Sequence, residues 1–456
     1  MQETLCHRFA AGLSGLRGDA LPPDVLHACK RALLDALGSA FAGQGTAEVE
    51  ALVQAAQAWG GAGEARLWGS TLTLNTPHAA LVNGTAVHAR EVDDFGGCGH
   101  SGAVVVPSAL GAADLRDVSG LELLVAICAG YEAAARVTDL VGGYADHNAL
   151  GWHGTGTCGV FGAAAAAARV LGLGGPATAQ ALALAGTYTG GLWAFLADGA
   201  MSKRLHAGKA AEGGVVAALL AQHGMTGPSH LFESSWGSFA DLYSAGEPDS
   251  QALLRGMGTD FMIFRSGFKP YACCRGCHSA LDAVLALLQQ HHLGASDVDS
   301  VSVHAPAHTV RQLGKQNVAN VLDAQMSLPY SVALALTFGR ADLEHYQAPH
   351  LDSAQLSALA RRVTLVEDPS RVTGSEPEVE LHLANGASVA MTVLKAKGDS
   401  ANPMSDEELQ RKFMALSMLH LDADHAASIA AMVWKLEQQP SVQPLLAMLG
   451  AGPRRH

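Results

Sequence analysis

The chain has 456 residues, of which 49% are hydrophobic and 16% are charged, and its formal net charge at pH 7 is −13. That length exceeds one ordinary hydrophobic core, so we expect two domains, and the composition excludes an intrinsically disordered protein. The acidic balance excludes the basic surface of a nucleic-acid-binding protein. It does not exclude an anionic small-molecule substrate, because the local cations of a pocket decide what binds there.

The first residues, MQETLCHRFA, lack the basic start and apolar run of a signal peptide, which predicts a cytoplasmic protein with reduced cysteines. The most apolar stretch, residues 159–173, contains Arg169 and is shorter than the ~20 apolar residues of a membrane span. We therefore interpret it as a buried helix and expect no membrane partner.

Helical spacing of apolar residues dominates the chain from Leu21 to about Leu254. Pro22 and Pro23 open the first clear helix, and Gly38 lies near its expected end. Further helices are predicted at residues 77–88, 120–140, 159–173, 177–186 and 207–223. No strand is expected in this part of the chain.

The pattern changes after Phe264. Alternating apolar residues predict strands in SVSVHAP (300–306) and RRVTLVED (361–368), and a hairpin in which residues 379–383 face residues 389–393. Asn385-Gly386 predicts a tight turn with two positive-φ positions between the hairpin strands. Helical runs at 279–288 and 329–338 lie between these strands, so this part of the chain is typical of an α+β domain.

Helix returns after Pro403, where Ser405 and Glu408 form a capping box, and residues 406–449 are predicted to be helical. The sequence therefore predicts a mostly α fold with an α+β second domain. The large all-helical domain is formed by both chain ends, residues 1–264 and 398–456, and the smaller α+β lid domain is inserted at residues 265–397.

Two short motifs match well-known sequence patterns but lack the surrounding sequence that those patterns require. Gly154 to Gly159 fit the dinucleotide pattern G-x-G-x-x-G, but no apolar strand precedes them, which favours a glycine-rich helix start whose N–H groups receive a carboxylate. Cys274 to His278 fit the haem attachment pattern C-x-x-C-H, but the chain shows no export signal and no second pair of zinc ligands. We expect reduced cysteines there, with no haem and no metal.

Ionisable residues gather in four segments of otherwise apolar sequence. Because an ionisable group in apolar surroundings costs desolvation energy that folding does not require, their gathering points to a functional site. The segments are NGTAVHAREVDDFGGCGH (83–100) with His88, Asp93, Asp94 and His100; GWHGTG (151–156) with His153; SKRLHAGK (202–209) with Lys203, Arg204, His206 and Lys209; and GFKPYACCRGCHSALD (267–282) with Lys269, Arg275, His278 and Asp282.

These segments, together with GHSGAVVVPSAL (99–110) and MSLPYSVALAL (326–336), occur in an order that resembles the MmgE/PrpD family, which includes 2-methylcitrate dehydratase, cis-aconitate decarboxylase and iminodisuccinate epimerase. The resemblance spans most of the chain. It implies a helical domain with an α+β lid, an active site between them, a homodimer, a small polycarboxylate substrate and no metal or organic cofactor. Two stretches, FGGCG before His100 and the Cys273–Cys274 doublet, depart from the pattern expected of the methylcitrate enzyme.

The resemblance also implies roles for single residues. It places Asp93, His100, His153, Lys203, His278 and Tyr330 at catalytic positions, and we expect Lys269, Arg275 and His206 to bind the substrate. Removing a proton beside a carboxylate without a metal requires cations that offset the developing charge, for which Lys203, Lys269 and Arg275 are candidates. The three catalytic histidines are candidates for the base and acid, Asp93 for orienting an imidazole, and Tyr330 for donating to a leaving hydroxyl or a substrate carboxylate.

The step after deprotonation decides the activity. Loss of a β-hydroxyl makes the protein a dehydratase, loss of CO2 a decarboxylase, and return of the proton to the other face an epimerase. A lyase of the dehydratase kind is the leading expectation, ahead of the decarboxylase and the epimerase. The non-enzymatic alternative is a binding protein for carboxylates or haem.

Overall fold

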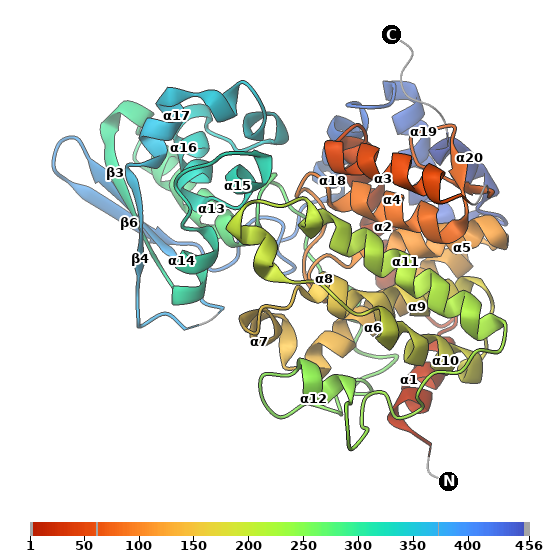
Figure 1. The fold of residues 1–456 in the computed structure, drawn as a ribbon. Helices are drawn as coiled ribbons and strands as arrows, with labels where there is room; N and C mark the ends of the chain where they lie inside the picture. Colours follow the sequence, from red (N-terminus) through yellow and green to blue (C-terminus); the bar gives the residue numbers. More distant parts are fainter. Residues whose placement is uncertain (1–2, 61–62, 373, 451–456) are drawn as a thin grey trace. The chain divides into compact units, whose positions relative to one another are not determined.

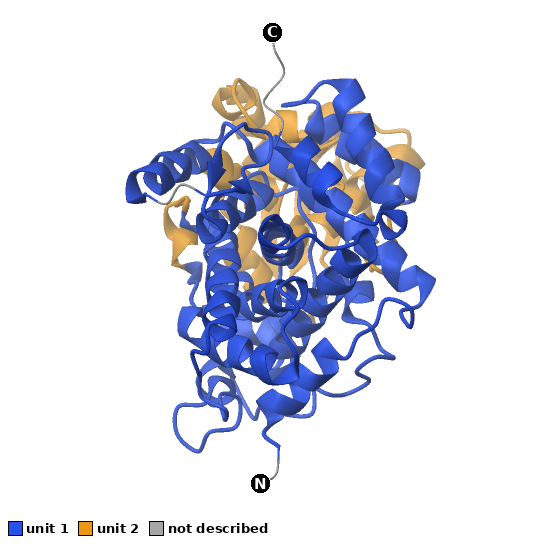
Figure 2. Cartoon of the chain, turned by 90° about the vertical axis from the view of Figure 1, so that its right-hand side faces the viewer, with its two compact units in different colours: residues 1–193, 202–267, 405–456 blue, residues 194–201, 268–404 orange. Residues whose placement is uncertain are grey.

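The computed structural model describes residues 3–60, 63–372 and 374–450, which form two compact units (Figure 2). Unit 1 comprises residues up to Trp193, Ser202–Gly267 and the chain from Ser405 onward, and unit 2 comprises Ala194–Met201 and Phe268–Met404. The inserted segment expected at residues 265–397 therefore corresponds to a unit that runs to Met404. Unit 2 also takes a short piece of chain, 194–201, that was expected in the helical domain.

Unit 1 is built almost entirely of helices. Its central helix α9 (Gly159–Val170) packs against α5 (Gly102–Leu115), α6 (Gly120–Leu140), α10 (Gly175–Ala185) and α11 (Ser202–Gln222), as Figure 1 shows. The other helices are α1 (Leu5–Ser14), α2 (Pro23–Gly43), α3 (Ala47–Trp59), α4 (Thr76–His88), α7 (Gly143–Ala149), α8 (Gly154–Thr157), α12 (Phe239–Tyr243), α18 (Asp406–Ser417), α19 (Ala423–Trp434) and α20 (Gln443–Leu449).

Small residues bring these helices close together. A Cβ atom added to Gly214 of α11 would lie 2.2 Å from the Cβ atom of Ala163 in α9, and one added to Gly162 would lie 2.7 Å from the carbonyl oxygen of Gly130 in α6. A side chain at either glycine would force the helix axes apart. The alanine run of α9 is buried for the same reason, as expected for the stretch that was too short for a membrane span.

The predicted helices of unit 1 are present, with shifted ends. Helix α6 has the expected bounds, whereas α2 continues five residues past Gly38 and α11 begins at Ser202 rather than at 207. The charged residues Lys203 and Arg204 conceal the start of α11 from the apolar pattern, although both are buried. The expectation of no strand before residue 254 is wrong, because β1 (Ala65–Arg66) and β2 (Thr73–Leu74) form a short antiparallel pair.

Unit 2 contains a four-stranded sheet in the order β4–β3–β5–β6. It also contains helices, which Figure 1 shows beside the sheet. Strand β3 (Val298–Ala305) is parallel to β4 (Val363–Glu367) and antiparallel to β5 (Glu378–Leu383), which pairs with β6 (Ser388–Thr392). The helices are α13 (His278–Gln290), α14 (Ala307–Leu313), α15 (Val321–Gln325), α16 (Leu328–Phe338) and α17 (Ala354–Ala360).

The hairpin of β5 and β6 has the predicted register, in which Leu381 faces Val389, but not the predicted turn. Gly386 has a φ of 84°, whereas Asn385 is not among the positive-φ residues of the described chain. The amide of Leu383 donates to the carbonyl of Ala387, which encloses three residues instead of two. A longer loop needs one left-handed residue, and glycine supplies it.

The C-terminal part of unit 1 begins with the predicted capping box. The Ser405 side chain accepts from the amide of Glu408, whose carboxylate accepts from the amide of Ser405. The helical tail is divided into α18, α19 and α20 rather than continuous.

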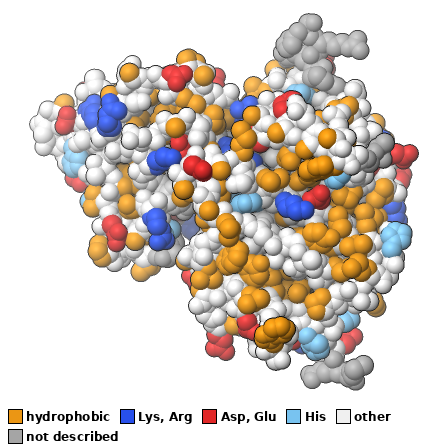
Figure 3. Space-filling model, viewed as in Figure 1, with side chains coloured by type: hydrophobic (Ala, Val, Ile, Leu, Met, Phe, Trp, Pro, Cys, Tyr) orange, Lys and Arg blue, Asp and Glu red, His pale blue; other side chains and the backbone are white. Residues whose placement is uncertain are grey.

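Hydrophobic side chains are exposed on the face of unit 1 that carries α11 (Figure 3). Leu205 of α11 is 36% exposed, and Trp236, in the turns after that helix, is 91% exposed. The homodimer implied by the family resemblance stays a prediction. Among the described residues, no helix combines the length and apolar character needed to cross a membrane.

Candidate acid–base site

Asp93 is the centre of a buried cluster in unit 1. Its Oδ2 atom lies 2.9 Å from Nδ1 of His88, the last residue of α4, and 3.0 Å from Nδ1 of His100, which lies just before α5. A carboxylate and a backbone carbonyl only accept hydrogen bonds, so His88 presents its Nδ1–H to Asp93. His100 presents its Nδ1–H to Asp93 and to the backbone carbonyl of Asp94, which lies 2.9 Å away. The carboxylate thereby fixes the tautomer of both imidazoles, whose ring centroids are 4.1 Å apart.

Lys203 extends this cluster from the first turn of α11. Its Nζ atom lies 3.2 Å from Nε2 of His88 and forms an ion pair with Glu91. Glu91 is 1% exposed and has a φ of 56°, in the left-handed region that a residue with a Cβ atom adopts at a cost of about 1 kcal/mol. A chain of hydrogen bonds therefore runs from Glu91 through Lys203, His88 and Asp93 to His100.

A pair of histidines lies beside this chain. Nδ1 of His153, in the segment before α8, is 3.0 Å from Nδ1 of His206 in α11, and the His153 ring meets the Trp193 ring edge-on at a centroid distance of 5.3 Å. Burial and the neighbouring His206 hold the pKa of His153 well below its usual range, and burial and Lys203 lower the pKa of His206 to about 4. Both rings are therefore neutral at pH 7.

The segment FGGCG fixes the position of His100. Gly96, Gly97 and Gly99 have φ values of 109°, 54° and 118°. A Cβ atom at Gly99 would lie 2.7 Å from the hydroxyl of Thr155, and one at Gly96 would lie 2.6 Å from the carbonyl oxygen of Arg265. The glycines that depart from the expected polar stretch thus allow a close, left-handed turn that delivers the imidazole to Asp93.

The adjacent acid, Asp94, has a different environment. It accepts hydrogen bonds from the Tyr131 hydroxyl (2.7 Å) and from the amide of Gly102 at the start of α5 (3.0 Å). Burial, Asp93 and Asp35 raise its pKa to about 7. Burial acts in the same direction on Asp93, but the rings of His100 and His88 outweigh it and hold the pKa of Asp93 well below its usual range.

The structure brings five of the predicted site residues together in unit 1: Asp93, His100, His153, Lys203 and His206. The other four lie in unit 2: Lys269, Arg275, His278 and Tyr330.

The four residues of unit 2 have their own contacts. Arg275 forms ion pairs with Glu376 (2.9 Å) and Asp399 (3.2 Å), so acidic side chains already offset the charge that was expected to bind substrate. Nε2 of His278 lies 3.3 Å from the carbonyl oxygen of Cys273, and the Tyr330 hydroxyl donates to the carbonyl of His345 (3.4 Å). Lys269 is buried. All eight cysteines are free thiols.

Two residues of the cluster are not among the predicted site residues. His88 stands in the segment singled out from the sequence, and Glu91 lies three positions later in HAREVDD. The signal was the density of ionisable residues at the end of a strongly apolar helix. It identified the segment, but spacing alone does not tell which of its side chains point inward.

These linked imidazole, carboxylate and ammonium groups are of the types that act in general acid–base catalysis, which makes the cluster a candidate site of that class. The chain belongs to the MmgE/PrpD family: residues 7–251 match the MmgE/PrpD N-terminal domain and residues 271–438 match the MmgE/PrpD C-terminal domain.

Curated relatives match the chain to different extents. Over 95% of this chain and 95% of its own length, the cis-aconitate decarboxylase-like protein oryM of Aspergillus oryzae is 28% identical. The cis-aconitate decarboxylase of Mus musculus is 26% identical over 98% of this chain and 94% of its own length. The 2-methylcitrate dehydratase of Cupriavidus necator is 28% identical over 42% of this chain and 39% of its own length. These relatives carry the names of lyases, and none of the names supports the epimerase alternative.

Proposed function

We propose that this protein is a lyase that decarboxylates a small unsaturated polycarboxylate of the cis-aconitate type. The observation that carries the proposal is the Asp93 carboxylate, whose Oδ2 atom binds Nδ1 of both His88 and His100. This arrangement leaves Nε2 of His100 as its proton-transfer atom. His100 is 7% exposed, whereas His88 and His153 are fully buried, so His100 is the ring of this group best placed to meet a substrate.

Decarboxylation of such a substrate requires one general acid. The bond from carbon to the departing carboxylate breaks, and its electron pair forms a new double bond. The electrons of the former double bond take a proton from Nε2 of His100, and CO2 leaves. The imidazolium that delivers this proton is stabilised by Asp93, as in the Asp–His pair of a catalytic triad.

The decarboxylase comes before the dehydratase here, which reverses the order expected from the sequence. Relatives with the decarboxylase name match nearly the whole chain, whereas the dehydratase of Cupriavidus necator matches less than half of it. The same acid–base group serves dehydration, in which a base removes the proton and an acid assists the leaving hydroxyl. The dehydratase therefore remains the second candidate.

The test incubates the full chain in D2O with cis-aconitate, 2-methylcitrate, citrate and iminodisuccinate, and follows each by NMR together with CO2 release. We expect CO2 and a product with one new C–D bond from cis-aconitate. Alkene formation from a hydroxy acid without CO2 would replace the decarboxylase with the dehydratase, and inversion of iminodisuccinate alone would show an epimerase. Turnover of none of the four would overturn the lyase proposal.

A matched pair of variants connects the activity with the site. His100→Gln should lower turnover by ~10²–10⁴-fold, the usual contribution of a general acid. His230→Gln changes an exposed ring whose partner is Glu233, 3.4 Å away, and should leave turnover unchanged. Equal effects of the two substitutions would show that His100 is not the acid.

A further inference from the structure

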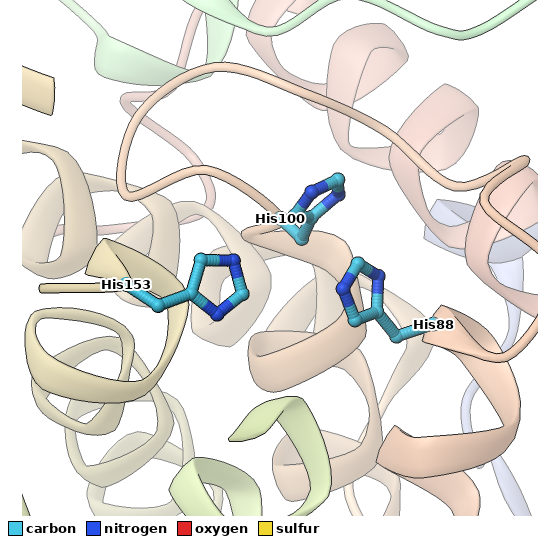
Figure 4. Close-up of side chains that lie close together, drawn as sticks. All are labelled: His88, His100 and His153. Atoms are coloured by element: carbon cyan, nitrogen blue, oxygen red, sulfur yellow. The ribbon is translucent and has the colours of Figure 1, made fainter. Parts of the chain in front are cut away.

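Three imidazole nitrogens converge inside unit 1. One ring nitrogen from each of His88, His100 and His153 lies within 4.8 Å of the other two, and all three residues are buried. Figure 4 shows the rings approaching one another from the end of α4, the segment before α5 and the segment before α8. Imidazole nitrogen is a common ligand for zinc, and three protein ligands are the usual number in sites that keep an open position.

Nδ1, the other ring nitrogen of each histidine, already has a hydrogen-bond partner. Asp93 accepts from Nδ1 of His88 and of His100, and Nδ1 of His153 lies 3.0 Å from Nδ1 of His206. A histidine that binds a metal usually has its other ring nitrogen held in this way, often by a carboxylate, which orients the ring and makes its ligand nitrogen more basic. The arrangement therefore resembles the outer shell of a metal site.

We propose that the Nε2 atoms of His88, His100 and His153 bind one divalent transition-metal ion of the zinc type. Zinc–nitrogen bonds of ~2.0–2.1 Å in a tetrahedral site place ligand nitrogens ~3.3 Å apart, so small ring rotations close the site. A fourth position stays open for water or a carboxylate. Occupation removes Nε2 of His100 from proton transfer, so in a protein with the proposed function the ion acts as an inhibitor.

Lys203 competes with the metal ion for Nε2 of His88. Its ammonium group lies 3.2 Å from Nε2 of His88, the atom that would bind the metal, and must leave when the ion enters. Replacing Lys203 by methionine removes that positive charge and leaves the Glu91 carboxylate, whose Oε1 atom is 3.9 Å from the same nitrogen. The site thus predicts tighter metal binding in Lys203→Met, which a merely structural role of the histidines would not produce.

The experiment titrates the full chain, without substrate, with Co²⁺ and Zn²⁺ after treatment with a chelator. Calorimetry measures stoichiometry and affinity, and the visible absorption of cobalt reports a tetrahedral site. We expect about one ion per chain with a tetrahedral cobalt spectrum. His100→Gln and His153→Gln should each weaken affinity by at least the ~10–100-fold that outer-shell changes cause, whereas Lys203→Met should strengthen it.

A second group of possible ligands serves as the control. Asp342, Glu344 and His345 of unit 2 also bring ligand atoms within 4.8 Å of one another, so Glu344→Gln tests whether the ion binds there instead. Loss of the cobalt spectrum in Glu344→Gln, or an unchanged spectrum in His100→Gln, would overturn the proposal.

Further readouts keep the test decisive if a ligand variant fails to fold. Lys203→Met retains all three histidines, and weaker cobalt binding in this folded variant would overturn the proposal. Binding is measured without turnover, so its failure is distinct from failure of the proposed lyase activity. Where activity is found, zinc should inhibit it, a chelator should restore it, and Glu344→Gln should remain equally sensitive.

Discussion

His100 in unit 1 and His278 in unit 2 are both buried imidazoles at the start of a helix, but their partners differ. Nδ1 of His100 lies 3.0 Å from the Asp93 carboxylate and 2.9 Å from the backbone carbonyl of Asp94, whereas Nε2 of His278 lies 3.3 Å from the backbone carbonyl of Cys273. Both partners fix a tautomer, but only the carboxylate brings a full negative charge to stabilise an imidazolium. The comparison separates a ring that a neighbouring carboxylate stabilises when it is protonated from a ring that a carbonyl orients.

The groups that surround His100 and His278 also differ. Around His278 lie the thiols of Cys273 and Cys277 and the hydroxyls of Ser331 and Tyr346, which are linked by hydrogen bonds. Around His100 lie carboxylates, an ammonium group and further imidazoles. Burial raises the pKa of the Cys273 thiol, but hydrogen bonds from Cys277 and His278 outweigh it and hold that pKa well below its usual range. Lys269 and Arg275 also act on His278 as cations. The two clusters therefore differ in the kind of charge beside the imidazole, which is a carboxylate at His100 and a thiol with two cations at His278.

The largest expected effect comes from removing the charge at the centre of unit 1. Asp93→Asn keeps the size of the side chain but removes the carboxylate that fixes Nδ1–H of His88 and His100. We expect turnover to fall by ~10³–10⁴-fold, as when the carboxylate of an Asp–His pair is neutralised. Steady-state kinetics on cis-aconitate would measure this, with circular dichroism to verify folding. A loss of less than tenfold in a folded variant would remove the distinction between the two histidines.

The difference between the two adjacent acids supplies the next prediction. Burial, Asp93 and Asp35 raise the folded-state pKa of Asp94 to about 7, above the 3.8 of an exposed carboxyl group. The folded protein therefore holds a proton that the unfolded chain releases, so this group costs stability progressively as the pH rises from about 4 to about 7. Asp94→Asn does not titrate, and its stability relative to the parent should increase over that range by about 3 to 4 kcal/mol.

Urea unfolding of both proteins between pH 4.5 and pH 8 would measure this difference. Asparagine can still accept from Tyr131 and Gly102, so the contacts of Asp94 need not be lost. Activity at pH 7 should change far less than in Asp93→Asn. A stability difference that is constant with pH would show that Asp94 is ionised throughout.

The sequence predicted the elements that carry the site better than the contacts within it. The periodicity of residues 77–88 and the glycines before His100 indicated a helix end followed by a turn, which is how α4 delivers His88 and how the turn delivers His100. The start of α11 was misplaced because Lys203 and Arg204 looked solvated. Their burial depends on Glu91 and Glu48, which are more than a hundred residues away in sequence.

The family resemblance supplied what periodicity cannot. Asp93, His100, His153 and Lys203 were expected at catalytic positions, and the structure brings these four into one cluster of unit 1. The pairing of Arg275 with Glu376 and Asp399 was not foreseen, because ion pairs across a hundred residues leave no local pattern. The same reason explains why Glu91, in the left-handed region, was missed.

A third prediction tests the unit 2 side of the comparison. His278→Gln should lower turnover by ~10²-fold, less than Asp93→Asn, because His278 lacks a carboxylate partner that would stabilise its imidazolium. The decisive readout is the division of the effect between kcat and KM, since a ring that only orients the segment around Cys273 would raise KM with little change in kcat. A loss of turnover equal to that of Asp93→Asn would show that His278 contributes as much to proton transfer as His100 does.

The smallest effect is expected among the hydroxyls near His278. In α16, the Ser331 hydroxyl accepts from Tyr346 at 2.9 Å and donates to the carbonyl of Ser327 at 2.8 Å. Ser331→Ala removes the acceptor of a buried phenol and should cost about 1 to 2 kcal/mol of unfolding free energy, with kcat unchanged. Thr337→Ala is the control, because its half-buried hydroxyl donates to the carbonyl of Ala333 in the same helix, and it should cost less than about 0.5 kcal/mol. If Ser331→Ala lowered kcat more than tenfold while remaining folded, the hydroxyls around His278 would take part in the chemistry, and proton transfer would not be confined to the histidines that Asp93 holds in unit 1.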